Sequence, residues 1–343
     1  MSGYTIEQRK QRWRDFLDPA KPPQHLFHIG FDPDAPPAPL PWPTLKAERI
    51  EWSWQRYVRQ MKTAEWLNDD RVPSLTVGTG TEIFAAAFGC PVMRPDDDMP
   101  YARPLLTGAS QVAKLPAPDI GAPSLADLFE IGDELRARGG KDVLLGMVDI
   151  QSPMDVAALI WDKNDFYVAM LEAPEAVKEL AHRVLALQTA FFDAWFARYG
   201  PDFIAHCPYY YIPRGVTLSE DEVGIVNAEM FTEFYLPELA ALSARYGALG
   251  MHCCANSRHQ WDNFKKIPNL QLLNITQPPE VTRQAYSFFA DHCIQYHGAL
   301  DGPAWEWPAK LPPGSRVVID VYPETEDQAR EAAEKLWTAC GRE

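Results

Sequence analysis

The feature that most constrains this fold is a rhythm in which short apolar runs alternate with long amphipathic segments. Runs of this length are typical of strands buried on both faces, and strands separated by helices pair in parallel. Eight such strands favour a closed (β/α)8 barrel over an open doubly wound sheet. We therefore predict an α/β fold of the TIM-barrel type. The predicted strands are residues 26–31, 74–78, 143–148, 203–206, 248–252, 270–275, 293–297 and 316–320.

The helices between the strands have recognisable ends. Residues 5–17 begin with Thr5 and Gln8, three apart, as a capping box requires. Two long helical patterns end immediately before Gly200 and Gly247, where glycine favours a helix end. Six prolines between Asp32 and Pro43 predict an irregular surface loop. The remaining predicted helices span residues 46–67, 174–199, 228–246 and 326–340.

Length and charge limit the organisation and the partners. We assign residues 1–343 to a single barrel domain, with residues 1–25 as an N-terminal helical extension. The chain has 32 Lys and Arg against 47 Asp and Glu, a formal net charge of −15. So acidic a surface repels phosphate backbones, and no nucleic-acid partner is expected.

Three further observations of the sequence bear on the cellular location of the protein and on the nucleotide cofactors it could bind. No apolar run reaches the roughly 18 residues that would span a bilayer, and the first ten residues lack an apolar signal core. We expect a cytoplasmic protein without a membrane partner, whose six cysteines are free thiols or ligands. Neither a dinucleotide-binding nor a P-loop glycine motif follows any predicted strand.

Chemistry in a (β/α)8 barrel lies where strands end and the following loops begin. Three histidines end three predicted strands, at His206, His252 and His297. Together with Glu82, which follows a strand and two glycines, we predict them as catalytic residues. The alternative for Glu82 is a helix carboxylate in the first turn. The other polar strand-end residues are expected to bind a small organic substrate: His28, Asp32, Asp149, Gln151, Tyr209, Tyr210, Asn274, Gln277 and Tyr322.

The sharpest motif is Gly250-Met-His-Cys-Cys-Ala-Asn256. Because side chains alternate faces along a strand, His252 and Cys254 point the same way and Cys253 points towards the helices. An imidazole and a thiol so placed make half of a zinc site, which could turn a substrate thiol into a thiolate. The alternative is a packed cysteine beside a hydrogen-bonded histidine. Asp320 is the first candidate for a third ligand, with Cys207, His206 and His297 as the others.

The order of several segments resembles the uroporphyrinogen decarboxylase superfamily. The resemblance covers most of the chain from about residue 140 onward and implies a distorted (β/α)8 barrel. The segments are Gln151-Ser-Pro-Met-Asp-Val-Ala157, Glu172-Ala-Pro-Glu-Ala-Val177, Asn227-Ala-Glu-Met-Phe-Thr-Glu-Phe-Tyr-Leu-Pro237, Met251-His-Cys-Cys-Ala-Asn256, Tyr296-His-Gly-Ala-Leu-Asp301 and Tyr322-Pro-Glu-Thr325.

The resemblance implies one of two activities. One branch decarboxylates uroporphyrinogen without a cofactor and holds its carboxylates with arginines near the N-terminus; here His28-Ile-Gly-Phe-Asp32 has none. The other branch transfers methyl groups between a corrinoid protein and a thiol, with zinc on H-x-C and a distant cysteine. His252 and Cys254 match that pair, but Val318-Ile-Asp-Val-Tyr-Pro-Glu-Thr325 has no cysteine, which is why Asp320 is offered. The resemblance also implies a homodimer.

Three hypotheses remain open. The first, which we favour, is zinc-assisted methyl transfer involving a corrinoid or thiol and a small organic substrate. The second is a metal-free decarboxylase or lyase acting on a carboxylated substrate, which requires arginines at the mouth; Arg214 and Arg258 are the candidates. The third is a non-catalytic barrel that binds a tetrapyrrole or a corrinoid-carrying partner.

Overall fold

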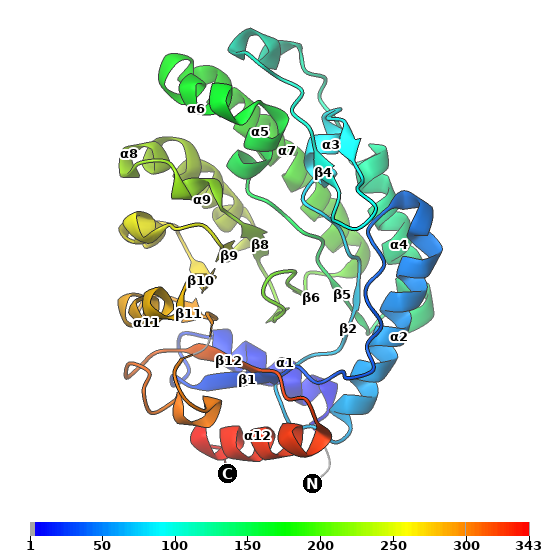
Figure 1. The fold of residues 1–343 in the computed structure, drawn as a ribbon, viewed down its shortest axis with the longest axis vertical. Coiled ribbons are helices and arrows are strands. Elements are labelled where there is room, and N and C mark those ends of the chain that lie inside the picture. The colour runs from blue at the N-terminus through cyan, green and yellow to red at the C-terminus, as the bar shows by residue number, and fades with distance from the viewer. Residues whose placement is uncertain (1–3, 299, 343) are drawn as a thin grey trace.

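The computed structural model describes residues 4–298 and 300–342. Its strands form a ring with helices packed outside it (Figure 1). Within the described residues, nine strands pair in parallel and make the ring, and the expected α/β fold of the TIM-barrel type is confirmed. In chain order they are β1 (His25–Ile29), β2 (Ser74–Thr76), β5 (Leu144–Gly146), β6 (Phe203–Ile204), β8 (Val216–Ser219), β9 (Leu249–Cys253), β10 (Leu270–Ile275), β11 (Ile294–Gln295) and β12 (Val317–Val321).

One predicted strand of the ring is shorter than expected. Of residues 203–206 only β6 (Phe203–Ile204) is a strand; it pairs in parallel with β5 at one residue pair and antiparallel with β7 (Tyr211–Ile212). The ring also includes β8, which was not predicted and whose end pairs with Gln151, after β5, through an isolated parallel bridge. β8 is four residues long and follows Pro213 and Gly215, so its sequence reads as a loop. A separate hairpin joins β3 (Val92–Met93) and β4 (Tyr101–Ala102).

The helices follow the predicted ends closely. α1 begins with the predicted capping box, in which Thr5 and Gln8 each accept the other's backbone N–H. α7 ends at Gly200, whose φ of 96° suits glycine. The helices are α1 (Ile6–Leu17), α2 (Lys46–Ala64), α3 (Ile83–Ala87), α4 (Pro123–Gly139), α5 (Pro153–Ile160), α6 (Lys163–Glu172), α7 (Pro174–Tyr199), α8 (Ala228–Met230), α9 (Leu236–Tyr246), α10 (Trp261–Phe264), α11 (Pro279–Phe288) and α12 (Glu326–Ala339).

Prolines explain the conformation of two segments, an irregular helix and a loop. The predicted helix at 228–246 is interrupted by a π-helical turn at Phe231–Tyr235. Pro237 has no N–H to donate back to the preceding turn, so the backbone locally widens. The described residues 30–42 contain neither helix nor strand, as the prolines predicted. None of the helices in the described part of the chain is long and apolar enough to cross a membrane.

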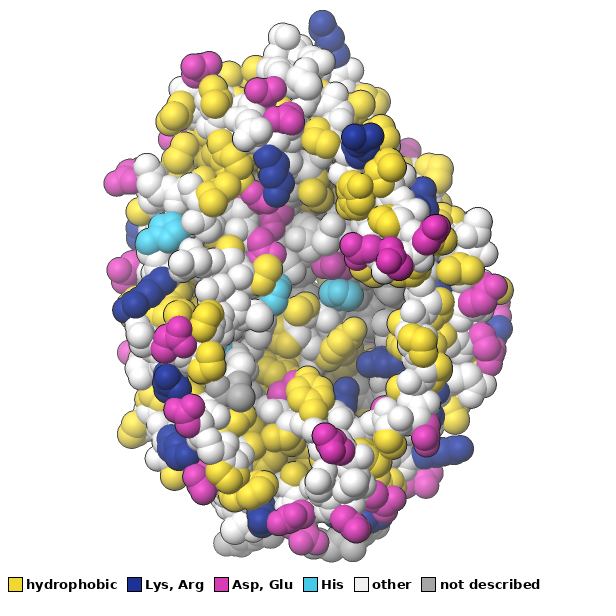
Figure 2. Space-filling model, viewed as in Figure 1, with side chains coloured by type: hydrophobic (Ala, Val, Ile, Leu, Met, Phe, Trp, Pro, Cys, Tyr) yellow, Lys and Arg dark blue, Asp and Glu magenta, His cyan; other side chains and the backbone are white. Residues whose placement is uncertain are grey.

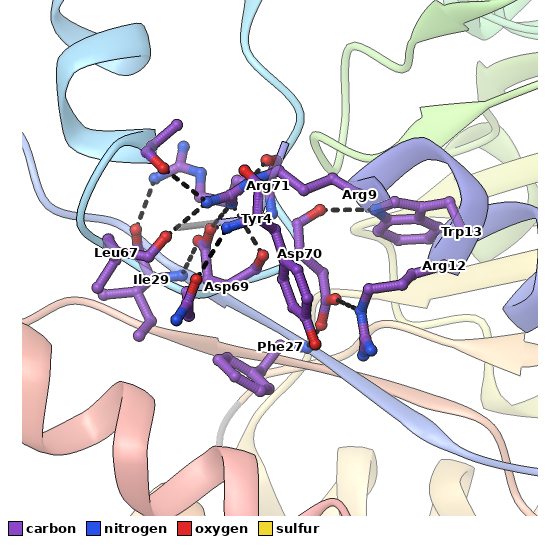
Figure 3. A network of polar contacts seen from close by, with 12 residues as sticks. Tyr4, Arg9, Arg12, Trp13, Phe27, Ile29, Leu67, Asp69, Asp70 and Arg71 are labelled. Carbon is purple, nitrogen blue, oxygen red and sulfur yellow. Dashed lines mark hydrogen bonds and ion pairs between the residues drawn. The ribbon is translucent and has the colours of Figure 1, made fainter. Parts of the chain in front are cut away.

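The ring has a seam between β1 and β2, where the described residues form no backbone ladder. Carboxylates from the loop before β2 satisfy the β1 edge instead (Figure 3). Asp70 accepts the N–H of Phe27 at 2.9 Å, and Asp69 accepts that of Ile29 at 3.0 Å. Because both carboxylates are buried, they need cationic partners.

Three arginines supply those partners. Arg9 of α1 pairs with Asp69. Arg12 and Arg342 each approach Asp70 to 2.6 Å. These cations hold the pKa of Asp70 below its ordinary value, although burial opposes them as the larger single influence. The predicted N-terminal extension is therefore part of the barrel's closure, since α1 reaches the seam.

Candidate functional site

The carboxyl ends of the ring strands face a hollow at the centre of the molecule. Figure 2 shows this face, with histidine, acidic and basic side chains around the hollow. Two groups of side chains lie here. One is a cluster of three side chains of types that can hold a metal ion, at the ends of β8 and β9. The other is a cavity at the seam between β1 and β2.

Asp221, His252 and Cys254 form the cluster, and one potential ligand atom from each lies within 4.8 Å of the others. The register explains this proximity. Ser219 of β8 pairs with His252 of β9, so the residues that follow each strand stay side by side. The N–H of Cys254 donates to the Asp221 carboxylate at 2.6 Å. The structure thus brings His252 and Cys254 together and adds Asp221, which the sequence analysis missed.

A buried carboxylate below the cluster fixes the loop that carries Asp221. Asp155 of α5 accepts the N–H of Asp221 at 2.8 Å and that of Glu222 at 3.0 Å. Ser152 caps α5 by accepting the N–H of Asp155 at 3.0 Å. Burial raises the pKa of Asp155 to about 7, and burial beside Asp155 raises the pKa of Glu220 well above its ordinary value.

Asn274 sets the chemistry of the His252 ring. Its Nδ2 donates to the Tyr296 carbonyl, so its Oδ1 faces His252 Nδ1 at 2.5 Å. Nδ1 therefore carries the proton, which leaves the Nε2 lone pair for a ligand. Gln277 helps to fix the backbone at Cys254, because its Nε2 donates to the Cys254 carbonyl at 2.7 Å.

The donor set fits a divalent metal such as zinc. Imidazole, thiolate and carboxylate are all zinc ligands, and three protein ligands leave a coordination position open. Burial, together with the adjacent Asp221, raises the pKa of Cys254 to about 12. Across residues 4–298 and 300–342, neither a lysine nor an arginine forms an ion pair with Asp221. A bound metal ion would supply the positive charge that stabilises both the Cys254 thiolate and the Asp221 carboxylate.

The predicted third ligand is not in this cluster. Asp320 lies on β12, three strands around the ring from β9. Its carboxylate accepts hydrogen bonds from Tyr296 at 2.9 Å and Tyr322 at 2.6 Å, and burial raises its pKa. Cys207 lies closer, with Sγ 3.5 Å from His252 Nδ1, but burial raises its pKa to about 11.

His297 connects two strands. Its Nδ1 accepts the N–H of Ile275 at 3.0 Å, so its Nε2 is protonated and donates to Gln295 at 3.0 Å. Burial lowers its pKa to about 3. Both ring nitrogens are thus engaged, and we expect a structural rather than a catalytic role for this predicted site residue.

His206, Asp149, Gln151 and Glu82 occupy another part of the strand-end face. His206 Nε2 lies 3.7 Å from an Asp149 oxygen, and its buried Nδ1 has no partner among the described residues. Gln151 donates to Asp149 at 2.8 Å. Glu82 is the N-cap residue of α3, and burial raises its pKa. The structure thus gathers one imidazole and two carboxyl groups here, side-chain types that can transfer protons in enzymes.

The seam cavity has a volume of about 320 Å³, near the small end of the usual range for ligand pockets. Five predicted substrate-binding residues line it: His28, Asp32, Tyr209, Tyr210 and Tyr322. Arg56 and Arg71 line it too, and the sequence analysis missed both. The arginines it proposed are elsewhere, because Arg214 lies beside Gly247 before β9 and Arg258 packs over Trp261.

The fold and this set of strand-end side chains define a barrel protein with a polar mouth. The family model for uroporphyrinogen decarboxylase (URO-D) matches residues 77–302, more than half of the chain. The chain therefore belongs to the uroporphyrinogen decarboxylase family. Among solved structures, a methyltransferase from Methanosarcina mazei matches with a TM-score of 0.65 and 12% identity, covering 98% of each chain. No match was found among curated proteins.

Proposed function

We propose that this chain catalyses metal-assisted methyl transfer involving a corrinoid or a thiol and a small organic substrate. The observation that carries the proposal is the convergence of Asp221, His252 and Cys254 at the barrel mouth. The structural similarity to a methyltransferase of Methanosarcina mazei supports the kind of reaction. In this proposal Asp221 takes the ligand position first assigned to Asp320.

Zinc bound by such ligands lowers the pKa of a thiol or water in its open position, and so supplies a nucleophile near neutral pH. The chain's own residues prepare that site. Asn274 holds His252 in the tautomer that can ligate, and Asp155 fixes the backbone of Asp221. In this proposal His206, which lies beside Asp149, accepts or returns a proton at the reacting group.

Metal content after purification without added zinc tests the proposal. We expect about one equivalent in the wild type, because three protein ligands hold zinc firmly. Asp221→Asn and Cys254→Ala should each weaken metal affinity at least about a hundredfold, because each removes a ligand. Asp320→Asn is the matched control and should leave the metal content unchanged.

Two outcomes would contradict the metal site or its assigned ligands. Less than about a tenth of an equivalent in the wild type, unchanged by Cys254→Ala, contradicts a metal site. Retention of metal by Asp221→Asn together with its loss from Asp320→Asn would restore the original ligand assignment.

One observation favours a second candidate, a metal-free decarboxylase or lyase. Such an enzyme needs cations for a carboxylated substrate, and Arg56 and Arg71 line the seam cavity. Buried Glu82, with its raised pKa, could return a proton to a carbanion. Wild-type protein that binds carboxylates but holds no metal would favour this candidate over methyl transfer.

A further inference from the structure

The walls of the seam cavity carry an unbalanced positive charge in a strongly acidic protein. Four arginines and two aspartates line it. Arg9 pairs with Asp69, and Arg59 approaches both oxygens of Asp32, at 2.9 and 3.1 Å. Arg56 and Arg71 form no ion pair with any carboxylate in the part of the chain that is described. These two guanidiniums therefore lack a salt-bridge partner, and the carboxylates of Asp32 and Asp320 act on them only from farther away.

Most of the donors on these two arginines are also unused. Arg56 donates from Nη1 to the Thr76 hydroxyl at 2.7 Å, and Arg71 donates from Nη1 to the Ile29 carbonyl at 3.1 Å. A guanidinium has five N–H donors, so each keeps several for a ligand. Burial, with Arg71 and Arg59 nearby, lowers the pKa of Arg56. Cations gathered in this way are costly to bury unless an anion joins them.

A second observation points to a ligand in the same cavity. His28 is only 4% exposed, lines the cavity, and has no partner for Nε2. The Tyr296 hydroxyl donates to Asp320, so at its 3.0 Å contact with His28 it accepts from Nδ1–H. Nε2 is therefore a buried acceptor. The Tyr210 hydroxyl, on a residue 2% exposed, also has no partner among the described residues.

We propose that Arg56 and Arg71 bind the carboxylate of a small organic acid, whose own hydrogen-bond donor is accepted by His28 Nε2. Tyr209 and Tyr322 supply aromatic walls for the body of the molecule. A planar carboxylate suits the guanidinium fork, which can bind both of its oxygens.

The loop of residues 206–210 connects this cavity with the metal-ligand cluster. The Arg56 guanidinium lies 5.4 Å from the centre of the Tyr209 ring, which is 6.1 Å from the His206 ring. Cys207, between them in sequence, contacts His252. An acid bound at Arg56 would therefore face one side of a loop whose other residues, His206 and Cys207, lie among the groups assigned to the reaction. As a substrate assignment, the inference rests on the proposed function.

Calorimetric titration with 4-hydroxybenzoate and with its neutral amide, 4-hydroxybenzamide, tests the inference. We expect the wild type to bind the acid at least about tenfold more tightly than the amide, the difference that one good charge-assisted contact makes. Arg56→Gln and Arg71→Gln should each remove most of that preference, while Arg56→Lys keeps the charge and part of the preference. Arg258→Gln, an arginine outside the cavity, is the matched control and should keep all of it.

Equal affinity of the wild type for acid and amide overturns the inference without any variant. So does full preference for the acid in a folded Arg56→Gln protein, as judged by its thermal melting. Metal content measured on the same samples separates the two proposals. Acid preference without metal overturns only the metal site, whereas metal without acid preference overturns only the carboxylate site.

Discussion

At the scale of single residues, Gly250 explains how the mouth is filled. It lies two residues before His252 and faces the same way. A Cβ atom at this position would lie 2.0 Å from the Tyr210 hydroxyl oxygen and 2.9 Å from Thr217 Cγ2. Tyr210 therefore occupies the space that a side chain at position 250 would need. The buried phenol, in turn, forms part of the wall of the seam cavity.

We expect Gly250→Ala to lower the free energy of unfolding by about 1–3 kcal/mol, because Tyr210 is buried and cannot move aside freely. Chemical denaturation measures the change. Gly78→Ala is the control: a Cβ there meets nothing within 4 Å, so the change should stay within about 0.5 kcal/mol. Equal effects of the two substitutions would show that Tyr210 is not tightly held.

Residue-level prediction succeeded where side chains alternate along a strand and failed where it needed a neighbouring strand. His252 and Cys254 could be paired from spacing alone. Asp221 could not, because it follows β8, which was not predicted; the acidic run Glu220-Asp221-Glu222 was the available signal. Arg56, which is half-buried, was missed because an arginine on an amphipathic helix is usually solvated; Arg49, seven residues earlier on the same helix, is buried.

At the scale of elements, the β1 edge depends on side chains rather than on another strand. Asp70 accepts the Phe27 N–H and pairs with Arg12 and Arg342. We expect Asp70→Asn to destabilise the protein by about 3–5 kcal/mol, because it leaves two partly buried cations without their anion. Urea denaturation gives the value. Glu7→Gln, which breaks the exposed pair with Arg14, is the control and should cost no more than about 1 kcal/mol.

A loss below about 1 kcal/mol for Asp70→Asn would show that the seam does not depend on this carboxylate.

Most helices and strands were predictable from the sequence, because local residue patterns mark where they begin and end. Capping residues and glycines marked the ends of α1 and α7. β8 had no such local signal, and only its register with β9 makes it a strand of the ring.

At the scale of the whole molecule, buried histidines link stability to pH. Burial lowers the pKa of His25 to about 4, and of His28 and His297 to about 3. Below the ordinary histidine pKa of about 6.5, these histidines are protonated in the unfolded chain but stay neutral in the folded chain. The free energy of unfolding therefore falls as the pH falls. Asp155 acts in the opposite direction: its raised pKa of about 7 means that its contribution is lost as the pH rises.

We expect His297→Gln to remove close to one proton from this linkage. The slope of unfolding free energy against pH, measured between about pH 5 and 6, should fall by about 1.4 kcal/mol per pH unit. His182→Gln, on an exposed position of α7, should leave the slope nearly unchanged. An unchanged slope in His297→Gln would mean that His297 charges in the folded protein.

At the seam between β1 and β2, buried ion pairs replace the backbone ladder that joins most other neighbouring strands of the described barrel. Elsewhere in the described ring, backbone hydrogen bonds join the neighbouring strands, in ladders or, between Gln151 and Ser219 of β8, in an isolated parallel bridge. At the seam, side chains from the first and last parts of the barrel make the connection, because Arg9 and Arg12 belong to α1 and Arg342 follows α12. Loss of α1 or of Arg342 would therefore weaken the wall against which the organic acid is proposed to bind, although both lie far along the sequence from Asp221, His252 and Cys254.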